Sequence, residues 1–385
     1  MASTRESPDP QHPSDPGQAE ASSIPRITTR RILSLALPAL GALIAEPLFT
    51  VIDSTMVGHL GTPELAGLGI ASTVLNTAVG LFVFLAYSTT SLAGRHLGAG
   101  RRDRAIRSGV EAMWLAGALG VLAALLLAVC ASPLLSWLGA DAATMPHALA
   151  YLRSSAPGLV GMFVVLAATG TLRGLQDTRT PLVPASVGAA YWTLMSPLGL
   201  GVAGSGLGTA ITQSLMALFL AWVILRAARR EGVELSPSVA GIFSAAAEGA
   251  PLLVRTLALR VALLATLSAV TAISTQALAA HQIVWTLWTF AAYVLDALAI
   301  AAQALAGFTQ GSGERGAMGP LVRLLSRWGV GFGIVVGLVL AMAAPWITRI
   351  FTTDTTVVDY ATVAIIVGAI FQPVAGYVFL LDGIL

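Results

Sequence analysis

The stretch RILSLALPALGALIAEPLFTVIDSTMVGHLG (31–61) decides the fold, because it is long enough to cross a membrane and yet contains acidic residues. A membrane-spanning helix requires about 20 predominantly apolar residues. Glu46, Thr50 and Asp53 follow the i, i+4, i+7 spacing and therefore share one face of the predicted helix. A carboxylate at bilayer depth costs about 2.5 kcal/mol or more, and Pro47 removes a backbone hydrogen bond beside these residues. We predict a bending membrane helix that binds a proton or a cation through Asp53 and Glu46.

The composition of the 385-residue chain is that of a polytopic membrane protein, with 56% hydrophobic and 10% charged residues. A soluble protein would carry about 25% charged residues. All the basic residues except the histidines are arginine, but no basic stripe with interleaved aromatic residues is present, so nucleic acid is not a predicted partner. The single cysteine, Cys130, excludes an intramolecular disulfide. We predict no metal and no cofactor.

Ten apolar stretches are long enough to cross a bilayer, which predicts an all-α fold of about ten transmembrane helices. They cover roughly residues 32–55, 65–93, 109–131, 148–172, 182–201, 203–226, 245–272, 277–308, 326–349 and 357–381. Arginines gather in alternate connections, and the 94–107 loop alone contains five. By the positive-inside rule, the N-terminus and the even-numbered loops are cytoplasmic.

An internal repeat at an offset of 213 residues organises these spans into two lobes. SLAGRHLGAGRR (91–102) aligns with ALAGFTQGSGER (304–315), and TPELAGLGI (62–70) aligns with TQALAAHQI (275–283). The first pair shares three glycines and a final arginine, which chance identity in an Ala/Leu-rich chain does not explain. Because six spans separate the copies, both have the same orientation. Two parallel six-helix repeats are an architecture of secondary transporters.

The repeat also predicts the boundaries of the parts, which are a disordered cytoplasmic tail at 1–30, an N-terminal lobe at 31–230, a cytoplasmic linker at 231–244 and a C-terminal lobe at 245–385. We predict that the C-terminal lobe lacks its last two spans, so that the chain is either truncated or an unusual protein of ten spans. TLRGLQDTRTP (171–181) ends the fourth span of the first lobe, and its counterpart LLDGIL (380–385) is where the sequence stops. A complete second lobe would need two more spans.

Seven motifs follow one another in order from residue 31 to the end of the sequence. They are VIDSTMVGHLG (51–61), STTSLAGRHLGAG (88–100), GLQDTRTPL (174–182), GVAGSGLGTAI (201–211), AAHQI (279–283), YVLDALAIAAQALAG (293–307) and YVFLLDG (377–383). The ordered set resembles the multidrug and toxic compound extrusion (MATE) transporters, in particular their DinF-like branch. The resemblance implies two lobes around a central cavity, with alternating access driven by inward flow of H⁺ or Na⁺.

The resemblance also implies roles for particular residues. Asp53 matches the first-helix aspartate that the family protonates as that helix bends, and Asp296 and Asp382 match acidic positions of the eighth and tenth helices. The fifth span departs from the pattern, because Trp192 and Ser196 stand where some relatives have Asn and Asp. A proton site with two carboxylates in the first lobe would then require Glu46.

A mixed polar and aromatic face on the eighth span is the candidate substrate or ion site. Gln282, Trp285, Thr289, Tyr293 and Asp296 share this face at helical spacing. Such a face suits a cavity for flat organic cations, which cation–π contacts of about 0.5–2 kcal/mol would hold. The alternative is that these side chains bond between helices. Asn76 and Thr73 of the second span are candidates for the same cavity in the first lobe.

Arg255 of the seventh span lies roughly 15 Å from the cytoplasmic end, at a depth similar to that of Asp296. Pairing would lower the cost of both charges in the membrane. We therefore predict an Arg255–Asp296 pair that acts as a latch and opens when a proton or a cation binds the aspartate. A purely structural ion pair is the alternative.

These observations predict a secondary active antiporter that exports organic cations or drugs in exchange for H⁺ or Na⁺. No ATPase motif and no Ser/His/Asp set is present, so we predict a transporter and not an enzyme. We expect a monomer in the bilayer of a bacterial plasma (inner) membrane. One alternative is a lipid-linked or polysaccharide flippase, which Arg255 and Arg260 would favour. The other is a truncated membrane protein or scaffold that does not transport.

Overall fold

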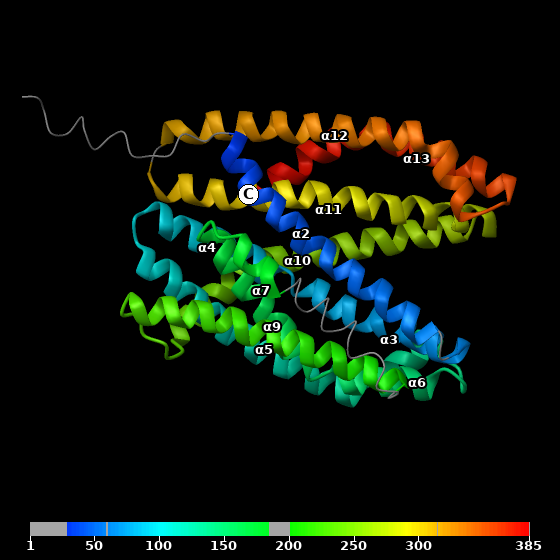
Figure 1. The fold of residues 1–385 in the computed structure, drawn as a ribbon, viewed down its shortest axis with the longest axis horizontal. Helices are drawn as coiled ribbons and strands as arrows, with labels where there is room; N and C mark the ends of the chain where they lie inside the picture. The colour runs from blue at the N-terminus through cyan, green and yellow to red at the C-terminus, as the bar shows by residue number, and fades with distance from the viewer. Residues whose placement is uncertain (1–28, 59–60, 185–200, 314, 385) are drawn as a thin grey trace, which may run out of the picture.

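The structure is a computed structural model, and it describes residues 29–58, 61–184, 201–313 and 315–384. Nearly all residues in these ranges are helical. Figure 1 labels the helices α2 (Thr29–Gly58), α3 (Thr62–Leu81), α4 (Phe84–Gly98), α5 (Arg102–Trp137), α6 (Met145–Ser155), α7 (Gly158–Gly174), α9 (Gly201–Arg230), α10 (Val239–Thr271), α11 (Thr275–Gly311), α12 (Arg315–Phe351) and α13 (Thr355–Ile384).

Most of the described helices are long enough to span a membrane. Seven segments are long and apolar enough to cross a bilayer, and the bent pair α6–α7 brings the number to eight. Helix α2 covers the first predicted span, whereas the span predicted at 182–201 lies largely outside the described ranges. The remaining eight predicted spans therefore each correspond to a membrane-length segment.

Two of the predicted spans are broken helices. The span predicted at 65–93 divides into α3 and α4 around Phe82 and Val83. The span predicted at 148–172 divides into α6 and α7, which meet at an angle of 52°. Pro157 directly precedes α7 and is the cause of the second break, because proline has no backbone N–H to donate and its ring obstructs the preceding turn.

The helices form two groups, each with its own buried core. In Figure 1, α11, α12 and α13 lie along the top and α3, α5, α6 and α9 lie along the bottom, with α2 running obliquely between them. The larger core cluster joins α3–α7 and α9, and a second cluster joins α11, α12 and α13. The two groups correspond to the two copies of the sequence repeat.

The first helix of each repeat packs against the opposite lobe. Ile32 near the start of α2 is fully buried in the core cluster of α11, α12 and α13. Ala245, its equivalent 213 residues later in α10, is buried in the core cluster of the N-terminal lobe. Gly249, one turn further along α10, lies against the ring of Phe84 in α4. The lobes are therefore tied together by an exchange of helices that follows the repeat.

Candidate functional site

The two lobes meet where the repeated glycine motifs of α4 and α11 cross. A Cβ atom added to Gly94 would lie 3.3 Å from the backbone nitrogen of Phe308 and 3.4 Å from the carbonyl carbon of Gly307. Gly94 and Gly307 are equivalent positions of the repeat. Small residues allow two helix backbones to approach so closely in a membrane. The repeat thus provides the contact surface between the lobes as well as their internal fold.

Asp296 of α11 faces the N-terminal lobe. The hydroxyl of Tyr87 in α4 donates a hydrogen bond to Oδ1 of Asp296 at 3.3 Å. The side-chain amide of Gln303, two turns further along α11, donates to the backbone carbonyl of Tyr87 at 3.0 Å. Arg173, in the last turn of α7, interacts electrostatically with the Asp296 carboxylate. Asp296 is therefore held by groups of the opposite lobe.

An ion pair lies within the C-terminal lobe. The guanidinium of Arg255 in α10 is bonded to the carboxylate of Asp382 in α13, and the two side chains are 40% and 39% exposed. The predicted pair of Arg255 with Asp296 is therefore wrong. Helix α13 runs beside α11 here, since a Cβ on Gly383 would lie 2.5 Å from the carbonyl oxygen of Ala299. This approach brings Asp382 to Arg255.

Sequence reasoning missed Tyr87 as the partner of Asp296. Tyr87 precedes the polar run Ser88, Thr89 and Thr90 inside an apolar span, and all three of those side chains are buried. Thr90 donates from its hydroxyl to the carbonyl of Gly170 in α7 at 3.0 Å. A polar run in a membrane segment, just before a glycine motif that is duplicated, was the available signal.

The other predicted residues of the C-terminal site lie nearer the start of α11. Gln282 and Trp285 are exposed, and Trp285 stacks on His281 with ring centroids 6.4 Å apart. The Thr289 hydroxyl donates to the carbonyl of Trp285 at 2.9 Å. Tyr293, one turn before Asp296, is half-buried. These residues continue the face that ends at Asp296, and their role in binding stays a prediction.

The predicted residues of the N-terminal lobe lie on α2 and α3. Thr73 and Asn76 are exposed on α3, and the Thr73 hydroxyl donates to the carbonyl of Gly69 at 2.8 Å. Glu46 and Asp53 belong to α2, which contains Pro38 and Pro47. The side chains of Glu46 and Asp53 lie outside the described part of the structure, so their predicted role is untested.

A further contact between the lobes lies at the arginine-rich end of the molecule. The guanidinium of Arg31 in α2 donates to the side-chain carbonyl of Gln176, which follows α7. The same guanidinium lies 5.6 Å from the centroid of the Phe308 ring in α11. Gln176 has a φ of 64°, a left-handed conformation that is uncommon outside glycine. Arg31, Gln176 and Phe308 thus close this end together with the α4–α11 crossing.

Comparison with known proteins places this architecture among characterised transporters. The MatE family profile matches residues 38–198 and 251–385. The chain is 31% identical to Protein DETOXIFICATION 44, chloroplastic, of Arabidopsis thaliana, over 98% of this chain and 74% of that protein. It is 28% identical to DNA damage-inducible protein F of Escherichia coli strain K12, over 91% of this chain and 78% of that protein.

Similarity in three dimensions agrees with these matches. The crystal structure of the Vibrio cholerae MATE transporter VcmN in the bent form superposes with a TM-score of 0.84 at 20% identity, and the match covers 92% of this chain and 82% of that one. The likeness confirms the predicted all-helical fold of two repeats.

Proposed function

Because the chain belongs to the MatE family of multidrug efflux transporters, we propose that it is an antiporter that exports organic cations in exchange for inward flow of H⁺ or Na⁺. The chain is a multi-pass membrane protein of that family, and it is a transporter and not an enzyme. Its substrates are small organic cations or drugs.

The observation that carries this proposal is the hydrogen bond between Tyr87 and Asp296, because it joins the two lobes through a carboxylate inside the membrane. Asp296 lies fifteen residues before Gly311, which is roughly 22 Å along a helix and about half of the roughly 40–45 Å thickness of a bilayer with its headgroup regions. A charge at that depth is retained for a function by default. Asp296 is therefore the coupling or substrate-binding group of the C-terminal lobe in this proposal.

Neutralisation of Asp296 is the proposed switching event. A hydrogen bond to a charged group contributes about 1.5–3 kcal/mol, whereas a neutral one contributes about 0.5–1.5 kcal/mol. A proton or a bound cation on Asp296 would also remove its attraction to Arg173. Both effects weaken the contact between the lobes, so the population would shift toward the state that is open at the arginine-rich end. Release of the proton or cation would restore the closed contact.

Asp53, with Glu46 as its neighbour on the same helix face, is the proposed proton site of the N-terminal lobe. Helix α2 carries Pro38 and Pro47, where an intrahelical hydrogen bond is missing and bending is easy. The charges of the two lobes are not duplicated, since Asp53 falls on Thr266 and Asp296 on Val83 at the repeat offset. The two lobes would therefore divide coupling and substrate binding between them.

A bacterial plasma membrane with a cytoplasmic N-terminus is the proposed location. The Escherichia coli relative supports it. The Arabidopsis relative is chloroplastic, so an organelle membrane is the alternative. The arginine distribution supports the orientation, and the chain is proposed to act as a monomer.

The flippase alternative requires arginine side chains that no carboxylate neutralises. Arg255 is neutralised by Asp382, which weakens this reading. Arg260 is exposed and lies beside Gly80 of α3, and in the described ranges no carboxylate is within 4.0 Å of it. A vesicle assay with a fluorescent lipid-linked sugar, comparing the wild type with Arg260→Gln, tests this alternative.

The main experiment measures ethidium uptake into inside-out vesicles under an imposed pH gradient or Na⁺ gradient. We compare the wild type with Asp53→Asn and Asp296→Asn, and we use Asp359→Asn as the matched control because Asp359 is exposed near the start of α13. We expect uptake under one gradient, its loss in both site variants and its retention in the control. Uptake that neither gradient drives, or that both site variants retain, would overturn the proposal.

A further inference from the structure

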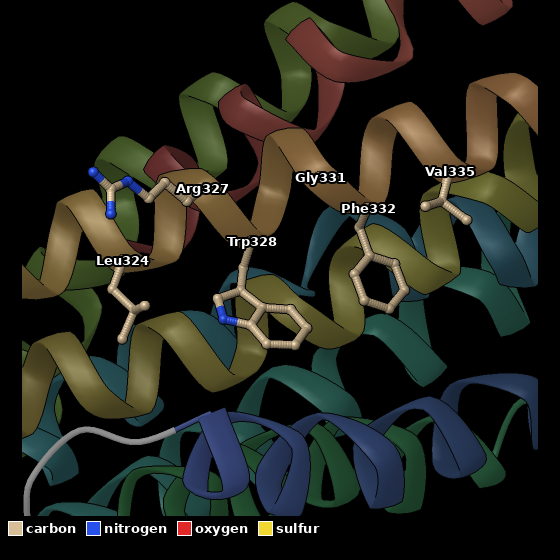
Figure 2. Close-up of a pocket in the computed structure, with 6 residues that line it drawn as sticks. All are labelled: Leu324, Arg327, Trp328, Gly331, Phe332 and Val335. Atoms are coloured by element: carbon tan, nitrogen blue, oxygen red, sulfur yellow. The ribbon is translucent and has the colours of Figure 1, made fainter.

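A groove lies on α12, and none of its lining residues belongs to the Tyr87–Asp296 contact. It has a volume of about 420 Å³, and its lining residues are Leu324, Arg327, Trp328, Gly331, Phe332 and Val335. All six come from one helix, and Figure 2 shows Trp328 and Phe332 projecting from the same side of it. Ligand pockets have volumes of roughly 300–1,000 Å³, so the groove is large enough for a part of a small molecule.

The body of the groove is apolar and open. The rings of Trp328 and Phe332 stack with centroids 6.1 Å apart, and both side chains pack partly against the core shared by α2, α11 and α13. Gly331 leaves open space beside the two rings, since a Cβ atom added there would meet nothing within 4 Å. Val335, at the far end, is exposed. An apolar chain fits such a space better than a polar molecule does.

Positive charge borders the groove at one end. Figure 2 shows the guanidinium of Arg327 extending toward the Leu324 end of α12. Arg323 precedes it by one helical turn, and both side chains are exposed. Throughout the described ranges, no carboxylate lies within 4.0 Å of either guanidinium. This is the end of α12 that the arginine distribution assigns to the cytoplasm.

We propose that this groove binds an anionic phospholipid, with one acyl chain over Gly331 and alongside Trp328 and Phe332, and the phosphate on Arg327 and Arg323. The groove lies on a membrane-spanning helix, so its ligand arrives from the bilayer. Basic sites at the cytoplasmic ends of membrane helices attract anionic headgroups, and arginine matches the geometry of a phosphate. The site does not depend on the antiport proposed above, because none of its residues belongs to that machinery.

Native mass spectrometry with purified protein tests the proposal, with phosphatidylglycerol and phosphatidylcholine as probes. We expect the wild type to bind phosphatidylglycerol more tightly. Arg327→Gln should weaken that binding roughly fivefold, since one arginine near an anionic surface contributes about 1 kcal/mol. Arg327→Lys keeps the charge and should keep the preference. Equal binding of the two lipids by the wild type, or an unchanged preference in Arg327→Gln, would overturn the proposal.

Filling the groove provides the second test. Gly331→Leu places a side chain in open space, so we expect a folded protein that has lost the tight phosphatidylglycerol adduct. Gly368→Leu on α13 is the matched control, because a Cβ there also meets nothing within 4 Å. Retention of the adduct in Gly331→Leu contradicts the site. A wild-type dimer that Gly331→Leu converts to a monomer would assign the groove to a second copy of the chain and also overturn the proposal.

Discussion

Gly98 of α4 and Gly311 of α11 are equivalent positions of the repeat, and each faces the backbone of the other's helix. A Cβ atom on Gly98 would overlap the carbonyl oxygen of Phe308, and one on Gly311 would overlap the carbonyl oxygen of Arg95. Arg95 and Phe308 are themselves 213 residues apart. The two contacts are therefore copies of each other about a two-fold axis between the lobes. Any motion that separates the lobes at this end must break both.

Gly98→Ala tests whether this crossing holds the lobes together. We expect the added methyl group to force the backbones apart at a cost of about 1–3 kcal/mol, which is typical of overpacking. Spin labels at Arg101→Cys and Gly316→Cys, in a Cys130→Ala background, should report a longer distance between the lobes. Gly311→Ala should have the same effect, since its contact is equivalent.

Gly117→Ala is the matched control for these variants. Gly117 lies inside α5, and a Cβ atom there would meet nothing within 4 Å. Its label distance should equal that of the parent. An unchanged distance in Gly98→Ala and Gly311→Ala would show that the crossing does not set the spacing of the lobes.

The Tyr87–Asp296 contact predicts an energetic coupling between the lobes. Tyr87→Phe removes the hydroxyl donor and Asp296→Ala removes the acceptor, and their effects should not add, because they act on one bond. We expect a coupling energy of about 1.5–3 kcal/mol in a double-mutant cycle of thermal unfolding if the carboxylate is charged in the closed state. Additive effects would mean that the two side chains do not interact in the membrane.

Charge exchange tests which carboxylate is the partner of Arg255. The single changes Arg255→Asp and Asp382→Arg should each lower the unfolding temperature, and the combined exchange should restore it. Because both residues lie on membrane-spanning helices, each single change leaves charges unpaired there, at a cost of about 2.5–3.5 kcal/mol per charge. Combining Arg255→Asp with Asp296→Arg should give no recovery. Recovery in that pair would show instead that Asp296 is the partner of Arg255.

The error over Arg255 shows what a sequence can and cannot predict here. Helical rise gave Arg255 and Asp296 similar depths, which is correct reasoning about position along each axis. Depth along the axis does not show how each helix is rotated about that axis. It also does not show which other helix packs beside Arg255. The close approach of Gly383 to Ala299 brings α13 to α11, and Asp382 with it. This contact belongs to the tertiary structure, and the spacing of residues within one span does not predict it.

The repeat, in contrast, correctly predicted the division into two lobes. Its glycines lie at the crossing of α4 and α11, because only residues without side chains permit backbone contact there. The breaks in two of the spans were harder to anticipate. Pro157 was visible in the sequence, but hydropathy alone reads the segment as one span. Gly80 lies two residues before Phe82, but no proline accompanies it, and a single glycine inside an apolar run does not by itself predict a break.

Because the first helix of each repeat packs against the opposite lobe, we predict which lobe a mutation in α2 destabilises. Ile32 is near the start of the chain's first lobe in sequence, yet it is fully buried in the core of the C-terminal lobe. Ile32→Ala should leave a cavity there and destabilise the protein by about 2–5 kcal/mol. Leu37→Ala is the control, since Leu37 is 62% exposed on the same helix. Hydrogen exchange should rise in Leu298–Leu305 of α11 and around Leu325 of α12 in Ile32→Ala alone, while α5, α7 and α9 stay unchanged. If exchange rises in α5 and α7 instead, α2 belongs energetically to the lobe in which its sequence begins.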